Sequence, residues 1–156
     1  MKKILAMLLA LVMVLSLAAC ASTQPAAEPA ASSDAPAESG KTYTVGVCQL
    51  VQHEALDAAT QGFVDALKEA LGDAVTIDVQ NASGDSVNCG TIVNGFVAKG
   101  VDLIMANATP ALTAAVSATA DIPILGTSIT AYGVALDIDD FNGTVGGNIS
   151  GTSDLA

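Results

Sequence analysis

Hydrophobic positions between residues 41 and 156 follow two different periods. Alternating or continuous apolar stretches predict strands, and apolar residues three or four positions apart predict helices. The predicted strands are residues 43–48, 75–80, 101–106, 122–125 and 133–138. The predicted helices are residues 54–71, 86–99 and 109–120. Alternating strands and helices indicate an α/β domain, a doubly wound parallel sheet flanked by helices on both faces.

Residues that commonly begin or end helices support these bounds. Gly72 and Gly100 follow the first two predicted helices, where glycine is a frequent stop. Thr109 is expected to cap the third helix, with Pro110 in its first turn. The turn at 83–85 is expected to supply a cap for the second helix. Residues 139–156 are rich in Gly, Asn, Ser and Thr, and no helix or closing element is predicted there.

The N-terminus has a pattern of its own. Two lysines precede an apolar run at residues 4–17, which ends in Leu-Ala-Ala-Cys20 and resembles a bacterial lipobox. We therefore expect a lipoprotein signal peptide at 1–19 and a lipid anchor on Cys20, with a plain secretory signal as the alternative. Residues 20–40 are dominated by Ala, Pro and Ser without apolar periodicity, which predicts a disordered tether. The folded domain is expected at 41–156.

The net charge of the chain argues against some classes of function. The chain has a net charge of −11, and without the expected signal peptide three lysines face 16 acidic residues, with no arginine. Such a surface repels nucleic acid and anionic lipid. The expected acyl chains therefore remain as the attachment to a membrane, on its periplasmic or cell-surface side.

The sequence contains no cluster typical of a cofactor, a metal or a catalytic centre. Cys48 and Cys89 are interpreted as two buried thiols, with a disulfide as the alternative. His53 is interpreted as a capping or solvated residue because no nucleophile is paired with it in sequence. The glycines at 143–147 lack the GK[ST] of a phosphate loop. No cofactor and no metal are expected.

Polar loops follow the predicted strands. They comprise residues 49–53, 81–85, 107–109 and 126–128. Ligands of doubly wound sheets bind beyond the carboxyl ends of the strands. Three of these loops lead into helix N-termini, which attract a carboxylate. The sequence therefore predicts a site for a small polar molecule at this edge.

Several of these stretches resemble one family in order and spacing. They are Val-Gly-Val-Cys-Gln-Leu-Val-Gln-His at 45–53, Gln-Asn-Ala-Ser-Gly-Asp at 80–85, residues 101–111, Ile-Pro-Ile-Leu at 122–125 and Gly-Gly-Asn-Ile-Ser-Gly-Thr-Ser-Asp at 146–154. Together they resemble ABC-transporter substrate-binding proteins of the TrpX/tyrosine-binding type.

The resemblance implies a periplasmic-binding-protein type I-like fold of two lobes that close on a solute. This chain is expected to hold the N-terminal lobe up to the hinge, with the second lobe missing. The expected solutes are aromatic amino acids or similar small molecules, and the expected partners are an ABC permease and its ATPase. Carried over by loop position, the implied ligand contacts are Gln49, Leu50, Asp85, Thr109, Ser128 and Asp154.

Two other function classes stay open at this point. A surface lipoprotein could use the same lobe as a sensor or scaffold for a protein partner, and a small flavodoxin-like enzyme would share the fold. The enzyme interpretation is disfavoured because no catalytic constellation is present. Tyr132, in a loop that departs from the family pattern, either stacks on a ligand or packs inside the lobe.

Overall fold

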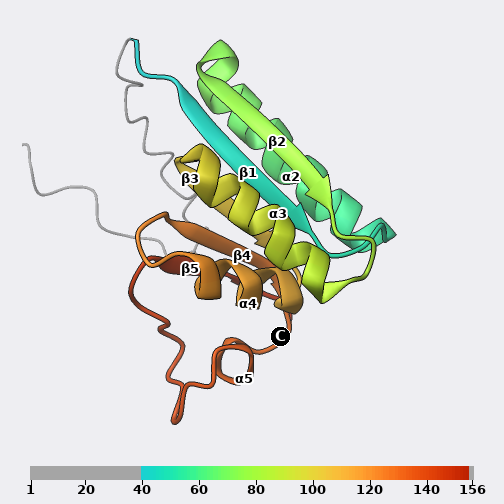
Figure 1. Cartoon of the computed structure of the whole chain (residues 1–156), viewed down its shortest axis with the longest axis vertical. Coiled ribbons are helices and arrows are strands. Elements are labelled where there is room, and N and C mark those ends of the chain that lie inside the picture. Colours follow the sequence, from blue (N-terminus) through green and yellow to red (C-terminus); the bar gives the residue numbers. More distant parts are fainter. Residues whose placement is uncertain (1–39, 155–156) are drawn as a thin grey trace, which may run out of the picture. The chain divides into compact units, whose positions relative to one another are not determined.

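The computed structural model describes residues 40–154, which form five strands with helices between them (Figure 1). The strands are β1 (Tyr43–Gln49), β2 (Val75–Asn81), β3 (Leu103–Asn107), β4 (Ile124–Ile129) and β5 (Ile149–Ser153). The helices are α2 (Glu54–Leu71), α3 (Ser86–Lys99), α4 (Thr109–Ala118) and α5 (Tyr132–Ala135), with a 3-10 turn, η1 (Gly72–Ala74). The predicted signal peptide, Cys20 and the tether up to residue 39 lie outside the described residues.

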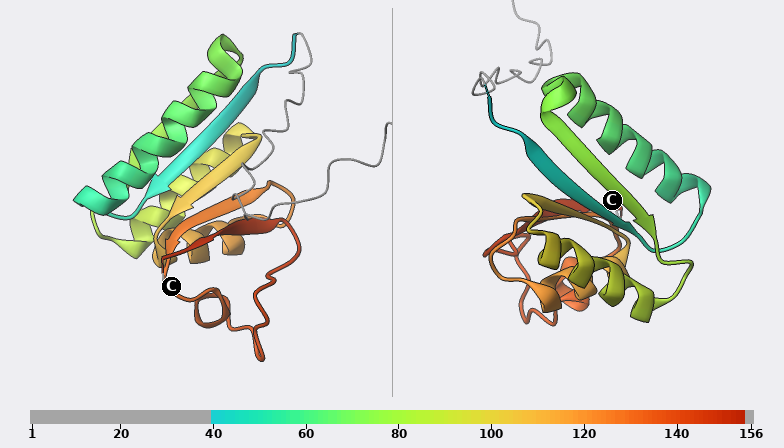
Figure 2. Two further views of the ribbon diagram at one scale, coloured as in Figure 1. Left: turned by 180° about the vertical axis from the view of Figure 1, so that it is seen from behind. Right: turned by 45° about the horizontal axis from the view of Figure 1, so that its top comes forward.

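The strands form a single parallel sheet in the order β2-β1-β3-β4-β5. Helix α2 covers one face, and α3 and α4 cover the other (Figure 2). Seen from the α2 side, β4 and β5 have no described helix in front of them (Figure 2, left). The predicted doubly wound α/β fold is confirmed.

The two faces of the sheet bury two separate hydrophobic clusters. Val45, Val47 and Met105 pack under α2, and a larger cluster around Phe96 and Ile104 packs under α3 and α4. Side chains of successive strand residues point to opposite faces, so one strand serves both clusters. Strands that are buried on both sides need the continuous apolar runs that the sequence has at β1 and β3.

Helix α3 approaches β1 very closely at Gly46. A Cβ atom built on Gly46 would lie 2.6 Å from ring carbons of Phe96, whose side chain is fully buried. The glycine therefore sets how closely α3 can pack on the sheet.

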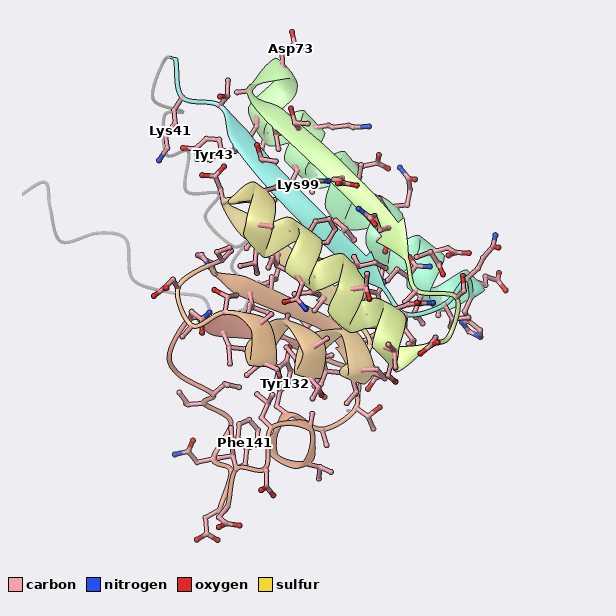
Figure 3. The ribbon with its side chains drawn as sticks, in the orientation of Figure 1. Lys41, Tyr43, Asp73, Lys99, Tyr132 and Phe141 are labelled. Carbon is pink, nitrogen blue, oxygen red and sulfur yellow. The ribbon has the colours of Figure 1, made fainter. Side chains whose placement is uncertain are left out.

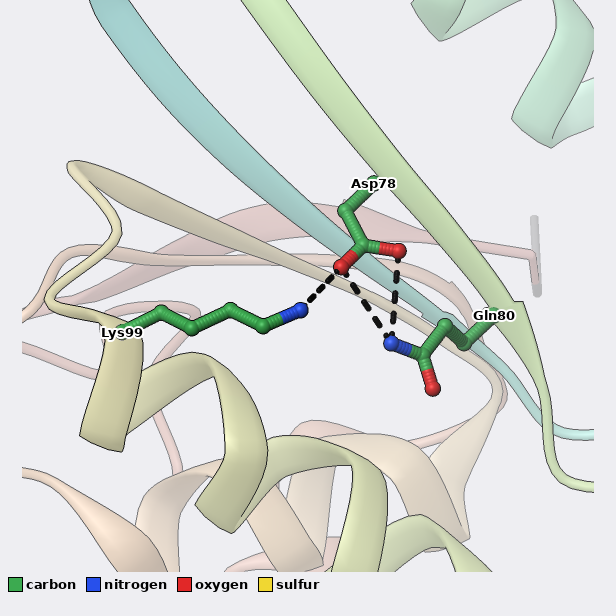
Figure 4. A network of polar contacts seen from close by, with 3 residues as sticks. All are labelled: Asp78, Gln80 and Lys99. Carbon is green, nitrogen blue, oxygen red and sulfur yellow. Dashed lines mark hydrogen bonds and ion pairs between the residues drawn. The ribbon is translucent and has the colours of Figure 1, made fainter.

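A polar contact joins the C-terminal end of α3 to β2. Lys99 Nζ lies 2.7 Å from Asp78 Oδ2, and Gln80 Nε2 donates to both oxygens of the same carboxylate (Figure 4). Lys99, labelled in Figure 3, lowers the pKa of Asp78 through this bond. Because the pair is largely exposed, it contributes little to stability.

The predicted fifth strand at 133–138 is wrong. Tyr132–Ala135 form helix α5, which brings Tyr132, Ala135 and Leu136 to the cluster under α4 and leaves Val134 85% exposed. The fifth strand is β5, within the stretch where no closing element was predicted. It carries a single large apolar residue, Ile149, because it is an edge strand with exposed faces, so hydrophobic periodicity could not reveal it.

Smaller differences concern element ends. Strand β3 begins at 103, α4 ends at 118, and β4 continues to 129, so residues 126–128 lie inside that strand instead of beyond it. Thr109 does not cap α4, because the N-cap is Ala108 and Thr109 is already helical. His53 does cap α2, through Ala55 N–H to its Nδ1 at 3.3 Å. Within residues 40–154, no helix combines the length and hydropathy needed to cross a membrane.

Candidate functional site

All five parallel strands end at the same edge of the sheet, and backbone hydrogen bonds join the loops there. We call this the strand-end edge; it consists of residues 49–53, 81–85, 107–109, 127–131 and 154. The joining bonds run from Leu50 N–H to Asn107 O (3.1 Å), Ala82 N–H to Gln49 O (2.9 Å), Ala108 N–H to Thr127 O (3.0 Å) and Asp154 N–H to Ile129 O (3.1 Å). The six candidate residues all lie along it.

Gln49 ends β1, and its side chain is buried and fully engaged inside the protein. Its Nε2 donates to Val51 O at 2.9 Å and to Asp57 Oδ1, and its Oε1 accepts from Thr60 Oγ1 at 2.6 Å. A primary amide has two N–H bonds to donate, and both are used here. The side chain of Gln49 therefore supports the edge from inside, while Leu50, the next residue, is half-buried.

Asn107 ends β3 directly beside Gln49 and joins the same network. Its Nδ2 donates to Leu56 O at 2.8 Å and to Thr60 Oγ1 at 2.9 Å. Its Oδ1 is buried and has no partner among the described residues. Burying an unsatisfied acceptor costs about 1–3 kcal/mol, so this residue is not optimal for stability alone. Thr60 was missed by the sequence reasoning; its signal is a hydroxyl on the apolar stripe of a helix.

Asp85 caps the first turn of α3. Its Oδ1 accepts from Val87 N–H at 2.8 Å, and the side chain remains exposed. Val87, in the same turn, is 75% exposed. This end of α3 therefore presents a carboxylate beside an aliphatic side chain.

Helix α4 begins without a side-chain cap. Ala108, its N-cap, has φ 92° and ψ 156°, and no side chain of the described residues accepts from the first turn. The N-terminal N–H groups of such a helix have no partner within the helix, and the helix dipole favours an anion there. Thr109, predicted for this position, is the first helical residue and is half-buried.

Three of the five non-glycine residues with positive φ in the described part of the chain lie on the strand-end edge. Ser83, Ala108 and Ser128 have positive φ, and they follow β2, follow β3 and lie within β4, respectively. Ser128 sits at an irregularity where β4 shifts its pairing with β5. Residues other than glycine rarely adopt positive φ, and such residues gather at ligand sites. Asp154 closes the edge after β5 and is exposed.

No aromatic ring is available on this edge. Tyr132 is buried with its hydroxyl donating to Gly126 O at 3.0 Å, so it packs inside instead of stacking on a ligand. Burial raises its pKa. Tyr43 starts β1 at the opposite end of the strand, and Phe141 lies beside α5 (Figure 3). The two remaining aromatic residues, Phe63 and Phe96, belong to the hydrophobic clusters.

Two thiols lie just behind the edge. Cys48 and Cys89 are free and fully buried, as predicted, and they contact one another between β1 and α3. Burial, reinforced by the neighbouring thiol, raises the pKa of Cys48 to about 12. Burial also raises the pKa of Cys89. Both side chains therefore remain protonated at neutral pH.

Two of the open grooves that border the edge include a candidate residue, and neither groove unites the candidate residues. One of about 750 Å³ runs between α2 and β2 and includes Gln49, and one of about 510 Å³ runs between α3 and α4 and includes Thr109. No group of three or more His, Cys, Asp or Glu side chains within 40–154 is placed to hold a metal ion. The edge is thus an open surface that presents hydrogen-bond donors, carboxylates and aliphatic side chains.

The fold is that of an α/β lobe with a candidate ligand edge, and sequence similarity identifies its family. The chain belongs to the ABC transporter substrate binding proteins, whose sequence profile matches residues 44–156. It is 38% identical to the Tyrosine-binding protein of Clostridioides difficile, over 98% of this chain and 45% of that protein. The family consists of binding proteins, which confirms the non-enzymatic interpretation and excludes the flavodoxin-like enzyme.

Solved structures agree with this assignment. A substrate binding protein with adhesive properties from Clostridium difficile, in a ligand-free, open structure, matches with 41% identity and a TM-score of 0.67, over 74% of this chain and 40% of that one. An ABC domain from Streptococcus pneumonia in complex with L-Trp matches with 36% identity and a TM-score of 0.66, over 72% and 39%. The chain therefore spans less than half the length of these relatives.

Proposed function

We infer that this lobe captures an aromatic amino acid, or a similar small solute, for an ABC uptake transporter. The observation that carries this proposal is the uncapped start of α4 on the strand-end edge of a chain from this family. Two relatives support the solute class, because one is named a Tyrosine-binding protein and the other was solved with L-Trp.

The edge offers complementary chemistry for an amino acid. The N–H groups of Thr109 and Ala111 in the first turn of α4 would receive the carboxylate, since they have no side-chain cap and Pro110 between them has no N–H. Asp154 and Asp85 are exposed carboxylates on the same edge and would attract the ammonium group. Ser128 would contribute a hydroxyl.

The ring of an aromatic solute would meet aliphatic side chains on this lobe. All five aromatic residues of the chain lie away from the strand-end edge or are buried. Leu50 and Val51 are half-buried apolar residues on the edge, and the exposed Val87 lies next to it in α3. An aliphatic surface of this kind would bury the ring without stacking on it.

Solute binding is tested by isothermal titration with L-tyrosine and L-tryptophan, with L-lysine as a comparison. We expect heat for the two aromatic amino acids, and a loss of at least tenfold in affinity for Asp154→Asn. Asp73→Asn, which removes the same charge at the opposite end of the sheet, is the control and should bind as the parent does. If no amino acid binds, the proposal fails and the sensor or scaffold alternative takes its place.

Export and anchoring form the second part of the proposal. The pattern of residues 1–20 supports cleavage before Cys20 and attachment of lipid to its thiol, which would hold the lobe outside the cell membrane beside an ABC permease and its ATPase. Cells fed an alkyne-tagged fatty acid should label the parent protein and leave Cys20→Ser unlabelled. Equal labelling of both would refute the anchor.

A further inference from the structure

Two amide side chains and one hydroxyl form a buried polar network directly beneath the strand-end edge. Gln49 and Asn107 end the paired central strands β1 and β3, and Thr60 faces them from the second turn of α2. The Thr60 hydroxyl donates to Gln49 Oε1 and accepts from Asn107 Nδ2, so it bridges the two amides. Thr60 is the central member of the network.

The network fixes the backbone of two loops that belong to the edge. Gln49 Nε2 reaches forward to Val51 O and so closes the start of the β1–α2 loop. Asn107 Nδ2 reaches Leu56 O in the first turn of α2, and the Asn107 carbonyl accepts from Leu50 N–H. The same residue immediately precedes Ala108, whose strained backbone starts α4.

The buried amide of Asn107 costs stability that an apolar side chain at the same position would not. Asn107 is fully buried, yet its Oδ1 has no partner within residues 40–154. The surrounding α2 side of the sheet is otherwise apolar, with Val45, Val47 and Met105 as its buried cluster. A leucine would suit the packing of such a position, whereas the uncharged amide gives two directed N–H bonds from one strand end.

The geometry points to Thr60, Asn107 and Gln49 as positioning residues that hold the β1–α2 and β3–α4 loops in their binding conformation without contacting the solute. The proposal rests on the proposed function for the role of the loops. Its structural part, control of loop conformation, holds independently of which solute binds.

Thr60 allows an isosteric test. Thr60→Val removes the hydroxyl but keeps the shape, and Thr60→Ser restores the hydroxyl. Val64→Ala, one turn further along α2, removes packing without touching the network and serves as the matched control. The four proteins are compared by amide hydrogen exchange of the full chain, a measurement that needs no ligand.

We expect Thr60→Val to speed exchange at least tenfold at the amides of Leu50 and Ala82, which bond to Asn107 O and Gln49 O. The amide of Asp102, bonded to Thr44 O at the opposite end of β1, should be unchanged. Thr60→Ser should match the parent. If Thr60→Val instead speeds all three amides equally, as Val64→Ala is expected to do, the residues are merely structural and the proposal is overturned.

Titration with L-tyrosine and L-tryptophan gives the second readout. Thr60→Val should lose at least tenfold in affinity while Val64→Ala and Thr60→Ser stay within twofold of the parent. Equal affinity of Thr60→Val and the parent would overturn the link between loop position and binding. If the parent binds neither amino acid while the local exchange pattern persists, the proposed solute class fails and the positioning role stands.

Discussion

Gly46 and Phe96 provide a quantitative test of how α3 packs on the sheet. Replacing Gly46 by alanine places a Cβ 2.6 Å from carbons of the Phe96 ring. Non-bonded carbons are comfortable at about 3.5–4.0 Å, so the overlap is about 1 Å. The ring is fully buried and cannot swing into solvent, so α3 itself must move.

Overpacking of this kind typically costs about 1–3 kcal/mol, and we expect Gly46→Ala to lie at the upper end. The backbone at Gly46 does not have positive φ, so alanine adds no backbone strain that could confuse the result. The chain has no tryptophan, so unfolding in urea is followed by far-UV circular dichroism. With a slope of about 1.5 kcal/mol/M, a loss of 3 kcal/mol lowers the midpoint by about 2 M.

Two further variants make the test specific. Gly62→Ala, on the exposed side of α2 with nothing within 4 Å of a new Cβ, should gain about 0.5–1 kcal/mol from helix propensity. Adding Phe96→Leu to Gly46→Ala should cost less than the two changes separately, with a coupling of about 1–2 kcal/mol, because the smaller side chain makes room. Strict additivity, or a Gly46→Ala midpoint equal to that of the parent, would refute the close packing.

Four other predictions concern charge, capping and strain. Burial raises the pKa of Cys48 to about 12, so above pH 9 the thiol of the unfolded chain loses its proton before the thiol of the folded chain. The free energy of unfolding should therefore fall with rising pH between 9 and 12, by at most about 1.4 kcal/mol per pH unit. The urea midpoint of Cys48→Ala should fall less steeply over the same range. Asp85→Ala should cost about 1 kcal/mol by loss of the cap, while Asp85→Asn should be nearly neutral in the same assay. Ala108→Gly should raise the melting temperature, because glycine relieves about 1–3 kcal/mol of backbone strain at this positive φ. This gain exceeds the entropic cost of introducing a glycine, about 0.5–1 kcal/mol. Asp78→Asn should cost less than about 1 kcal/mol, an effect that 1 M salt abolishes, because Lys99 is largely exposed.

The sequence predicted most of the helices and strands correctly, because their buried positions follow the apolar spacing that is visible in the sequence. The bounds of α2 and α3 were obtained to the residue, since apolar spacing and the following Gly72 and Gly100 agree. Strands buried on both faces were likewise visible as apolar runs. β5 was not, because an edge strand held by pairing with β4 needs few apolar residues.

The candidate site was predictable in place but not in detail. A parallel sheet fixes which loops share an edge, so the order of the strands and loops located it. Whether a side chain points outward or inward depends on tertiary packing, which the spacing of residues in the sequence does not show. Gln49 points inward and bonds Thr60, and Tyr132 points inward and bonds Gly126. The strained backbone of Ala108 also has no signal in the sequence, because alanine carries no preference for that conformation.

Because all five strands run in the same direction, the two ends of the sheet differ in how well they should tolerate substitutions and insertions. The turn at η1, with Asp73 at its exposed tip, lies at the end of the sheet remote from the strand-end edge (Figure 3). Strand β2, seven residues long, separates the two ends by about 23 Å. A fluorophore attached at position 73 would therefore leave the strand-end edge untouched while reporting on the tumbling and assembly of the lobe. This end is also where an affinity tag or an inserted loop should be accepted without loss of binding.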